Sequence, residues 1–141
     1  VFVRGNPTNL GKVVPRGYLT LFASKFDSPR PSVQGSGRLY LAQSMLQASS
    51  SLMSRVIVNR LWNQLFGAGI VRTPSDFGVQ GERPSHAELL EYLATQLVLH
   101  DWDMKWLIRE IVLSHTYQQS SEYRLEADAI DPENRWLWRM S

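Results

Sequence analysis

A long polar connector between two helical patterns constrains the fold of this chain more than any other feature. Residues 69–91, GIVRTPSDFGVQGERPSHAELLE, follow one apolar helical pattern and lead into another. The connector lasts about fifteen residues, whereas helix–helix connections usually take about two to eight. Its glycines and short polar side chains favour turns that bond their own backbone. Such a loop either carries function or is held by its own side chains, and both interpretations stay open.

Apolar residues at helical spacing predict five helices around this connector. The predicted ranges are about 38–47, 52–66, 85–99, 104–117 and a last helix from 131 onwards. Residues 123–130 are polar and acidic and are predicted to form a loop.

Residues at the expected helix ends strengthen this prediction. Gly67 and Gly69 are expected to supply the left-handed residue that ends the second helix. Ser85 and Glu88 have the spacing of a capping box at the start of the third. Asp103 is a candidate N-cap for the fourth, and Asp131 precedes a proline at the favoured first position of the fifth.

The fold class predicted is therefore mostly α: a small orthogonal helical domain of about five helices with an irregular N-terminal segment. Residues 1–37 are expected to be an irregular or extended segment with a linker, the tail of a preceding region. Residues 38–141 are expected to form the helical domain, truncated at its C-terminus. The chain starts without methionine, so a fragment of a larger protein is expected.

Composition excludes several classes of site. The chain has no cysteine, which rules out disulfides, thiolate metal sites and covalent haem attachment within it. No apolar run approaches the about twenty residues that a membrane-spanning helix needs. We therefore expect no membrane span and no cofactor in this segment.

Charge is divided unevenly along the chain. Residues 1–72 carry nine Lys and Arg against one Asp, giving +8, and residues 73–141 carry six basic against twelve acidic residues, giving −6. The basic half could meet an acidic partner, or the two halves could pack together and neutralise each other. Singly spread basic residues favour neutralisation. They also argue against nucleic-acid binding, since no basic run alternates with aromatics.

A polar cluster at the start of the connector is the best candidate ligand site. Its members are Arg72, Thr73, Ser75 and Asp76, joined by Asn59 and Arg60 from the preceding helix. Arg72 would donate two hydrogen bonds to a carboxylate, a sulfate or a sugar oxygen, with Asp76 orienting it or accepting from a hydroxyl.

A purely structural interpretation of the same loop is favoured over the ligand site. In it, Thr73–Asp76 is a self-capped turn, Phe77 plugs the core, and Gly78 and Gly81 take positive φ.

Histidines and acidic residues offer little support for catalysis or metal binding. His86, His100 and His115 show no metal-binding spacing, so no metal site is predicted. His115 is expected to border the core along the fourth helix. Neither a serine nucleophile nor a spaced carboxylate pair is indicated. The tryptophans are expected mostly in the core, with one possible as a platform for sugar stacking.

Several motifs together resemble one bacterial family. SGRLYLAQ, SRVIVNRLWNQLFGAGIVRTPSDFGVQGERPSHAELLEYLA, DWDMKWLIREIVLSHTYQQSS and DPENRWLWRM, covering about residues 36–141, resemble the planctomycete-specific domain of unknown function. That domain usually follows a cytochrome-c-like domain in large exported proteins. The resemblance implies an extracytoplasmic setting, periplasmic or secreted, and a larger parent protein in which haem is possible. It carries no catalytic residues over.

The chain departs from the family pattern in two places. Relatives commonly have a His-His pair where this chain has Gln64 and Leu65, and an Asn-Pro-Leu-Thr turn in place of residues 50–53. Any metal or haem-related role of the paired histidines is therefore missing here.

The function expected from these observations is that of a non-catalytic accessory domain that binds or scaffolds. Its partners would be other domains of the parent protein and a polysaccharide or protein. The alternative is part of an enzyme, an oxidoreductase or a polysaccharide-degrading unit, whose site is completed outside this segment. A shallow, polar, aromatic-rimmed surface would favour the binder.

Overall fold

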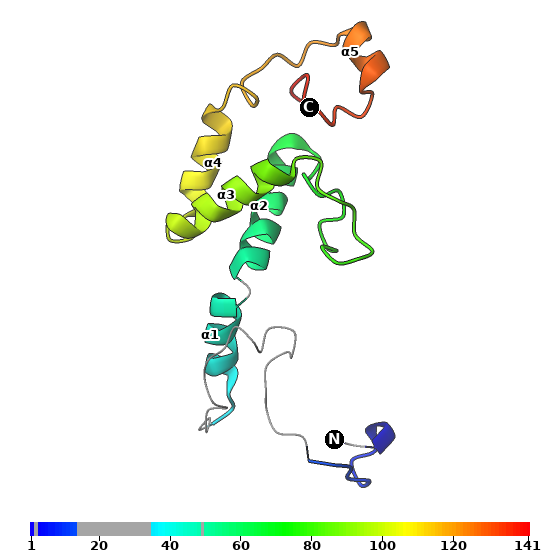
Figure 1. Cartoon of the computed structure of the whole chain (residues 1–141), viewed down its shortest axis with the longest axis vertical. Helices are drawn as coiled ribbons and strands as arrows, with labels where there is room; N and C mark the ends of the chain where they lie inside the picture. The colour runs from blue at the N-terminus through cyan, green and yellow to red at the C-terminus, as the bar shows by residue number, and fades with distance from the viewer. Residues whose placement is uncertain (2, 14–34, 49) are drawn as a thin grey trace. The chain divides into compact units, whose positions relative to one another are not determined.

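The computed structural model describes residues 1, 3–13, 35–48 and 50–141. Within these residues the protein is mostly helical and no β-strand is present, which confirms the predicted fold class. The extended runs and the linker expected within residues 14–34 lie outside the described residues. In chain order the α-helices are α1 (Arg38–Ala48), α2 (Ser50–Phe66), α3 (Ala87–Leu99), α4 (Met104–Leu113) and α5 (Leu125–Ile130) (Figure 1).

The chain divides into two compact units, Val1–Ser49 and Ser50–Ser141. The first contains a 3-10 turn at Val3–Gly5 and helix α1. Apolar residues at helical spacing predicted the helix at 38–47, yet three of them, Leu39, Met45 and Leu46, are exposed on α1. A boundary between residues 37 and 38 stays a prediction. The candidate site lies wholly in the second unit.

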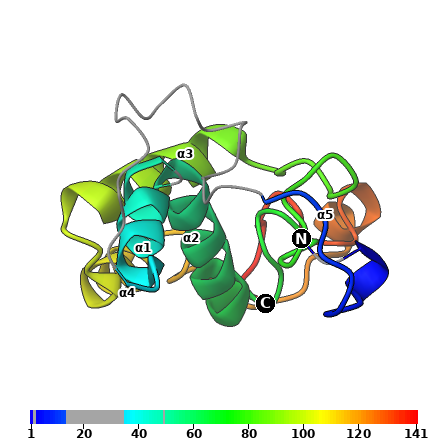
Figure 2. The ribbon, with the colours of Figure 1, turned by 90° about the horizontal axis from the view of Figure 1, so that it is seen from below.

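The core of the second unit is built by α2, α3, α4 and the connector. Helix α3 lies across α2 in both views of the ribbon (Figures 1 and 2). Apolar residues three and four positions apart give each helix one buried face. The Trp62 and Phe66 rings stack with centroids 4.1 Å apart, and Tyr117 meets Phe66 edge-on at 5.5 Å. The buried core residues are Val58, Trp62, Phe66, Ile70, Val71, Leu90, Leu93, Ala94, Leu97, Leu107 and Ile111.

A tight turn reverses the chain between α3 and α4. Asp101 and Trp102 both adopt left-handed backbone conformations, which end α3. The Asp103 side chain then accepts hydrogen bonds from the backbone amides of Lys105 and Trp106, at 2.9 and 3.1 Å. This confirms Asp103 as the N-cap, because its carboxylate satisfies amides that have no partner within the helix.

Helix α4 ends earlier than the sequence pattern predicted, at Leu113 rather than residue 117. The Ser114 hydroxyl donates to the Ile111 carbonyl at 2.6 Å and accepts from the Tyr117 amide at 3.2 Å. Serine thus offers the backbone an alternative to continuing the helix. His115 is exposed beyond this end, so its predicted place at the edge of the core is wrong.

The C-terminal region contradicts the predicted order of loop and helix. Residues 125–130, expected as a loop, form α5, while the segment from Asp131 onwards, expected as a helix, forms turns. The Asp131 carboxylate does accept backbone amides, from Arg135 at 2.9 Å and Trp136 at 2.7 Å. Asn134, which lies between Asp131 and these two residues, takes a left-handed conformation, which a right-handed helix excludes.

Among the described residues, two ion pairs join a basic residue of positions 1–72 to an acidic residue of positions 73–141. Arg55 on α2 binds Glu91 on α3, with Nε 2.7 Å from the carboxylate. Arg72 in the connector binds Glu133 in the C-terminal segment at 3.2 Å. Both pairs lie within the second unit, and the expected neutralisation of the two halves as wholes stays a prediction.

Candidate functional site

The connector begins at a buried polar anchor on α2. The Asn59 side chain, with no exposed surface, donates to the Val71 carbonyl at 2.9 Å and accepts from the Val71 amide at 2.8 Å. Gly69 lies against this pair, and a Cβ there would come within 2.9 Å of both Asn59 amide atoms. Gly67 takes the predicted left-handed conformation, whereas Gly69 is needed for this close approach instead.

The next part of the connector is a turn held by its own polar groups. The Thr73 hydroxyl donates to the Asp76 carbonyl at 2.8 Å and accepts from the Glu82 amide at 3.0 Å. The Asp76 carboxylate accepts from the Gly78 amide at 2.8 Å, and the side chain of Ser75 is exposed. Thr73 and Asp76 therefore stabilise the turn, as the structural interpretation of this loop expected.

Two details of that interpretation need correction. Gly78 and Gly81 do not take positive φ. Gly81 is required for a different reason, because a Cβ there would overlap the Asp76 backbone carbonyl. Phe77 does pack, partly buried, against the core cluster.

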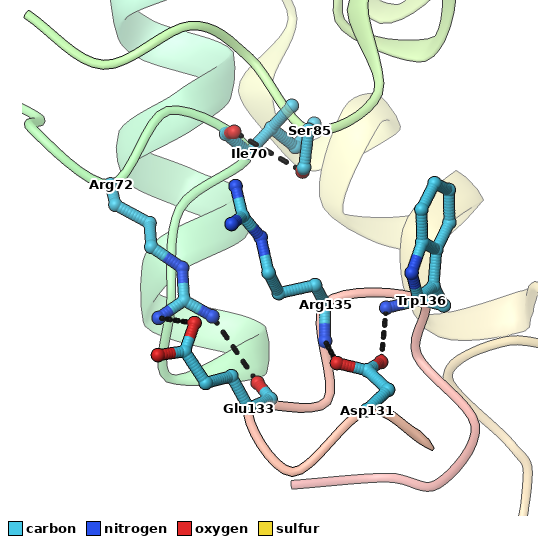
Figure 3. Close-up of polar contacts among 7 residues, drawn as sticks. All are labelled: Ile70, Arg72, Ser85, Asp131, Glu133, Arg135 and Trp136. Atoms are coloured by element: carbon cyan, nitrogen blue, oxygen red, sulfur yellow. Dashed lines mark hydrogen bonds and ion pairs between the residues drawn. The ribbon is translucent and has the colours of Figure 1, made fainter. Parts of the chain in front are cut away.

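Arg72 points away from this turn and meets the C-terminal segment. Its guanidinium binds the Glu133 carboxylate and also donates to the Glu133 backbone carbonyl, both at 3.2 Å (Figure 3). The acceptor expected for it was Asp76. The pairing with Glu133, 61 residues further along the chain, attaches the connector to the last turns of the protein.

The six residues proposed from the sequence thus fall into separate places. Asn59 is buried, with its amide nitrogen and oxygen both bonded to Val71. Arg60 is exposed on α2 with no hydrogen bond or ion pair among the described residues. Thr73, Ser75 and Asp76 belong to the self-bonded turn, and Arg72 belongs to the contact with Glu133. A ligand-binding role for these residues stays a prediction.

Ser85 and His86 complete the connector where it returns to α3. The predicted capping box is wrong, because His86 takes the N-cap position and no side chain caps α3. Ser85 bonds Ile70 instead: its amide donates to the Ile70 carbonyl at 2.9 Å and its hydroxyl at 3.2 Å. The hydroxyl oxygen also lies 3.0 Å from His86 Nδ1.

A small hollow opens where the start of the connector, Ser85–His86 and the C-terminal segment meet. Its volume is about 30 Å³. We call it the basic hollow, since arginines from two segments stand at its wall. The lining residues are Trp62, Ala68, Gly69, Ile70, Arg72, Ser85, His86, Asn134, Arg135 and Leu137.

Two arginines, Arg72 and Arg135, line the basic hollow, and of these Arg135 has no counterion among the described residues. The Arg72 charge is compensated by Glu133, whereas the exposed Arg135 guanidinium has no hydrogen bond or ion pair with any described residue. In Figure 3 the Arg135 side chain runs from the C-terminal segment towards Ile70 and Ser85. The Asp131 carboxylate binds the backbone amide of Arg135 and that of Trp136. This fixes the backbone from which the guanidinium extends.

Sequence reasoning missed Arg135 because residues 131–138 were assigned to a helix. A helical pattern gives no reason to place that arginine beside Arg72. The signal that was present, an aspartate followed by proline, indicated an acceptor of backbone amides. It did not indicate the turn that brings Asn134 and Arg135 to the connector.

Neither metal ligands nor a membrane segment emerges from the described part of the chain. Among those residues no three His, Cys, Asp or Glu side chains gather as a metal site would require. None of the described helices is long and apolar enough to cross a bilayer.

The second unit is a small helical domain with the basic hollow at its surface, lined by polar and apolar residues in about equal measure. Residues 37–141 match the PSD1 family, described as a protein of unknown function (DUF1553). The match covers most of the chain, which therefore belongs to this family. No curated protein and no solved structure matches the chain.

Proposed function

We propose that this chain is a non-catalytic binding domain that recognises an anionic group of a large partner at the basic hollow. The observation that carries the proposal is the unpaired guanidinium of Arg135 at the wall of that hollow. An arginine can hold a carboxylate or sulfate through two parallel hydrogen bonds. Arg72, Ser85 and His86 add further polar groups within the same wall.

The size of the hollow favours a binder over an enzyme. Pockets that enclose a small substrate usually measure about 300–1,000 Å³. The basic hollow, at about 30 Å³, has room for one or two water-sized groups. It can admit the tip of a ligand, such as a carboxylate, while the rest of that ligand stays on the surface. A long polymer or a protein suits such a site better than a small molecule.

The cellular setting is proposed from the resemblance given above. It supports an accessory role, by binding or scaffolding, in the extracytoplasmic part of a larger protein that contains a cytochrome-c-like domain. The enzyme alternative, an oxidoreductase or polysaccharide-degrading unit, requires catalytic groups supplied by that parent. Cell fractionation with haem staining of the parent protein tests the setting, and a cytoplasmic, haem-free parent would contradict it.

Calorimetric titration of the chain tests the binding role. The ligands are an oligogalacturonate, a sulfated oligosaccharide and an oligoglutamate peptide. Arg135→Ala should abolish binding of whichever anion is recognised. Arg135→Lys should weaken it, because an ammonium cannot reproduce the two-pronged contact.

Arg109→Ala is the matched control, since Arg109 is an exposed arginine on α4 with no hydrogen bond or ion pair among the described residues. Binding that is lost in Arg135→Ala and kept in Arg109→Ala supports the proposal. Equal weakening in both variants would mean unspecific attraction of charge. That result, or the absence of binding to all three anions, would overturn it.

A further inference from the structure

An exposed indole stands beside the basic hollow. Trp136 follows Arg135 directly, and 72% of its surface is exposed. Its ring meets the His86 imidazole edge-on, with centroids 5.5 Å apart and an angle of 81° between the planes. His86 lines the hollow. A large apolar ring is thus held at the rim of a site whose wall carries a free cation.

The backbone fixes this ring rather than leaving it on a loose chain end. The Trp136 amide donates to the Asp131 carboxylate at 2.7 Å, and the Arg135 amide donates to the same carboxylate at 2.9 Å. Asp131 is only 7% exposed. One buried acceptor therefore positions the cation and the ring together, and both side chains leave the same turn (Figure 3).

We infer that the anionic partner is a carbohydrate whose sugar rings carry carboxylates, with one carboxylate on Arg135 and a sugar face on Trp136. This inference rests on the proposed function and specifies its ligand. A sugar ring has an apolar face of C–H groups that an indole can cover, while its polar rim stays in water. The carboxylate is the part small enough to enter a space of about 30 Å³.

An acidic peptide fits the same surface less well. Peptides are usually recognised along a sheet edge, in a helix-binding groove or across several side-chain pockets. The described residues around Arg135 provide one small hollow and one flat ring. That combination matches the alternation of charge and flat apolar face along a polyuronate.

The test compares three ligands of matched length: an oligogalacturonate, the neutral galactose oligomer and an oligoglutamate peptide. Wild type should bind the oligogalacturonate most tightly. Trp136→Ala should weaken that binding at least about tenfold, the loss expected for a contact residue near the hot-spot range. Tyr92→Ala, which removes an exposed aromatic ring on α3, should leave it unchanged.

Tryptophan fluorescence of a Trp136→Phe variant separates the signal of Trp136 from that of the other tryptophans. The ligand-induced change in wild-type emission should disappear in Trp136→Phe, while calorimetry shows that this variant still binds. Thermal melts confirm that each variant is folded.

The outcomes separate the two proposals. Equal binding of oligoglutamate, with no effect of Trp136→Ala but loss in Arg135→Ala, would overturn the carbohydrate inference and keep the anion site. Binding of the neutral oligomer as tightly as the acidic one would overturn both. No binding of any of these three ligands would overturn the carbohydrate inference, and the anion site would fall with it if the sulfated oligosaccharide also fails to bind.

Discussion

Asn59 on α2 and Val71 in the connector exchange two hydrogen bonds, one in each direction, at 2.9 and 2.8 Å. An asparagine side chain has the same donor and acceptor as a peptide group, so it pairs with Val71 as a neighbouring strand would. Asn59 and Val71 are both buried. The connector is therefore fastened to the helix before it at the point where it leaves the core.

Asn59→Ala is expected to destabilise the domain strongly. The substitution leaves the amide and carbonyl of Val71 buried without partners, at a cost of about 1–3 kcal/mol for each group. Chemical denaturation measures the change in the free energy of unfolding. Gln64→Ala, an exposed site on the same helix, serves as control and should stay within about 0.5 kcal/mol of wild type. A similar small change in Asn59→Ala would refute the anchoring role.

Local sequence signals predicted the existence and approximate positions of α1, α2, α3 and α4. The repeating apolar positions of α2 and α3 become the core, and Asp103 caps α4 as its position indicated. These features depend on residues within one or two helical turns, which the sequence displays directly.

The C-terminal turns and the basic hollow depend on contacts between distant segments. Asp131 was correctly expected to accept backbone amides, yet only the fold shows that they come from Arg135 and Trp136 in a turn. Asp76 was expected to orient Arg72, but the carboxylate that pairs with Arg72 is that of Glu133. No spacing rule connects residues so far apart, so the unpaired Arg135 could not be found from the sequence.

Asp131→Ala should loosen the C-terminal turns. The carboxylate is nearly buried and each of its oxygens accepts one backbone amide. Its removal should cost about 1–3 kcal/mol and make the amides of Arg135 and Trp136 exchange faster with solvent. Glu122→Ala, an exposed acidic site, should do neither. Hydrogen exchange and denaturation measure both effects, and unchanged protection of the two amides would count against this account.

Two helix starts should respond differently to loss of a side chain. Asp103→Ala removes the acceptor of two amides at the start of α4, for an expected cost of about 1 kcal/mol. Glu110→Ala, exposed in the same helix, should change stability by less than about 0.5 kcal/mol.

Ser85→Ala removes no cap from α3, because the Ser85 hydroxyl bonds the Ile70 carbonyl and His86. The helix content of Ser85→Ala, measured by circular dichroism before and during denaturation, should therefore equal that of wild type. A loss of helix content that corresponds to the first turn of α3 would instead support the predicted capping box.

Two glycines of the connector should differ in their tolerance of alanine. A Cβ at Gly81 would overlap the backbone carbonyl of Asp76, which can move only with the turn. Gly81→Ala should therefore cost about 1–3 kcal/mol. A Cβ at Gly78 would lie 3.1 Å from the Asp76 carboxylate oxygen that accepts the Gly78 amide, and this exposed side chain need move only a few tenths of an ångström. Gly78→Ala should stay within about 0.5 kcal/mol of wild type, and thermal melts that rank the two variants oppositely would contradict this view.

Tyr123 offers a prediction on pH. Its hydroxyl donates to the Asp128 carboxylate at 2.7 Å, and this bond raises the pKa of Tyr123 above its ordinary value of 10.0. Desolvation and the negative charge of Asp128 raise the pKa of Tyr123 further, while the charge of Arg139 opposes them. The folded state favours the neutral phenol. This contribution to stability is fully present below pH 10 and is lost as the pH rises through the raised pKa.

The phenolate absorbance of wild type minus that of Tyr123→Phe gives the titration of Tyr123 alone. Its midpoint should lie above 10.0, and Asp128→Asn should move it down, because the neutral amide no longer repels the phenolate. Glu126→Gln, which neutralises an exposed carboxylate of the same helix, should leave the midpoint in place. A wild-type midpoint at or below 10.0, or one that Asp128→Asn does not shift, would show that the bond to Asp128 does not form in solution.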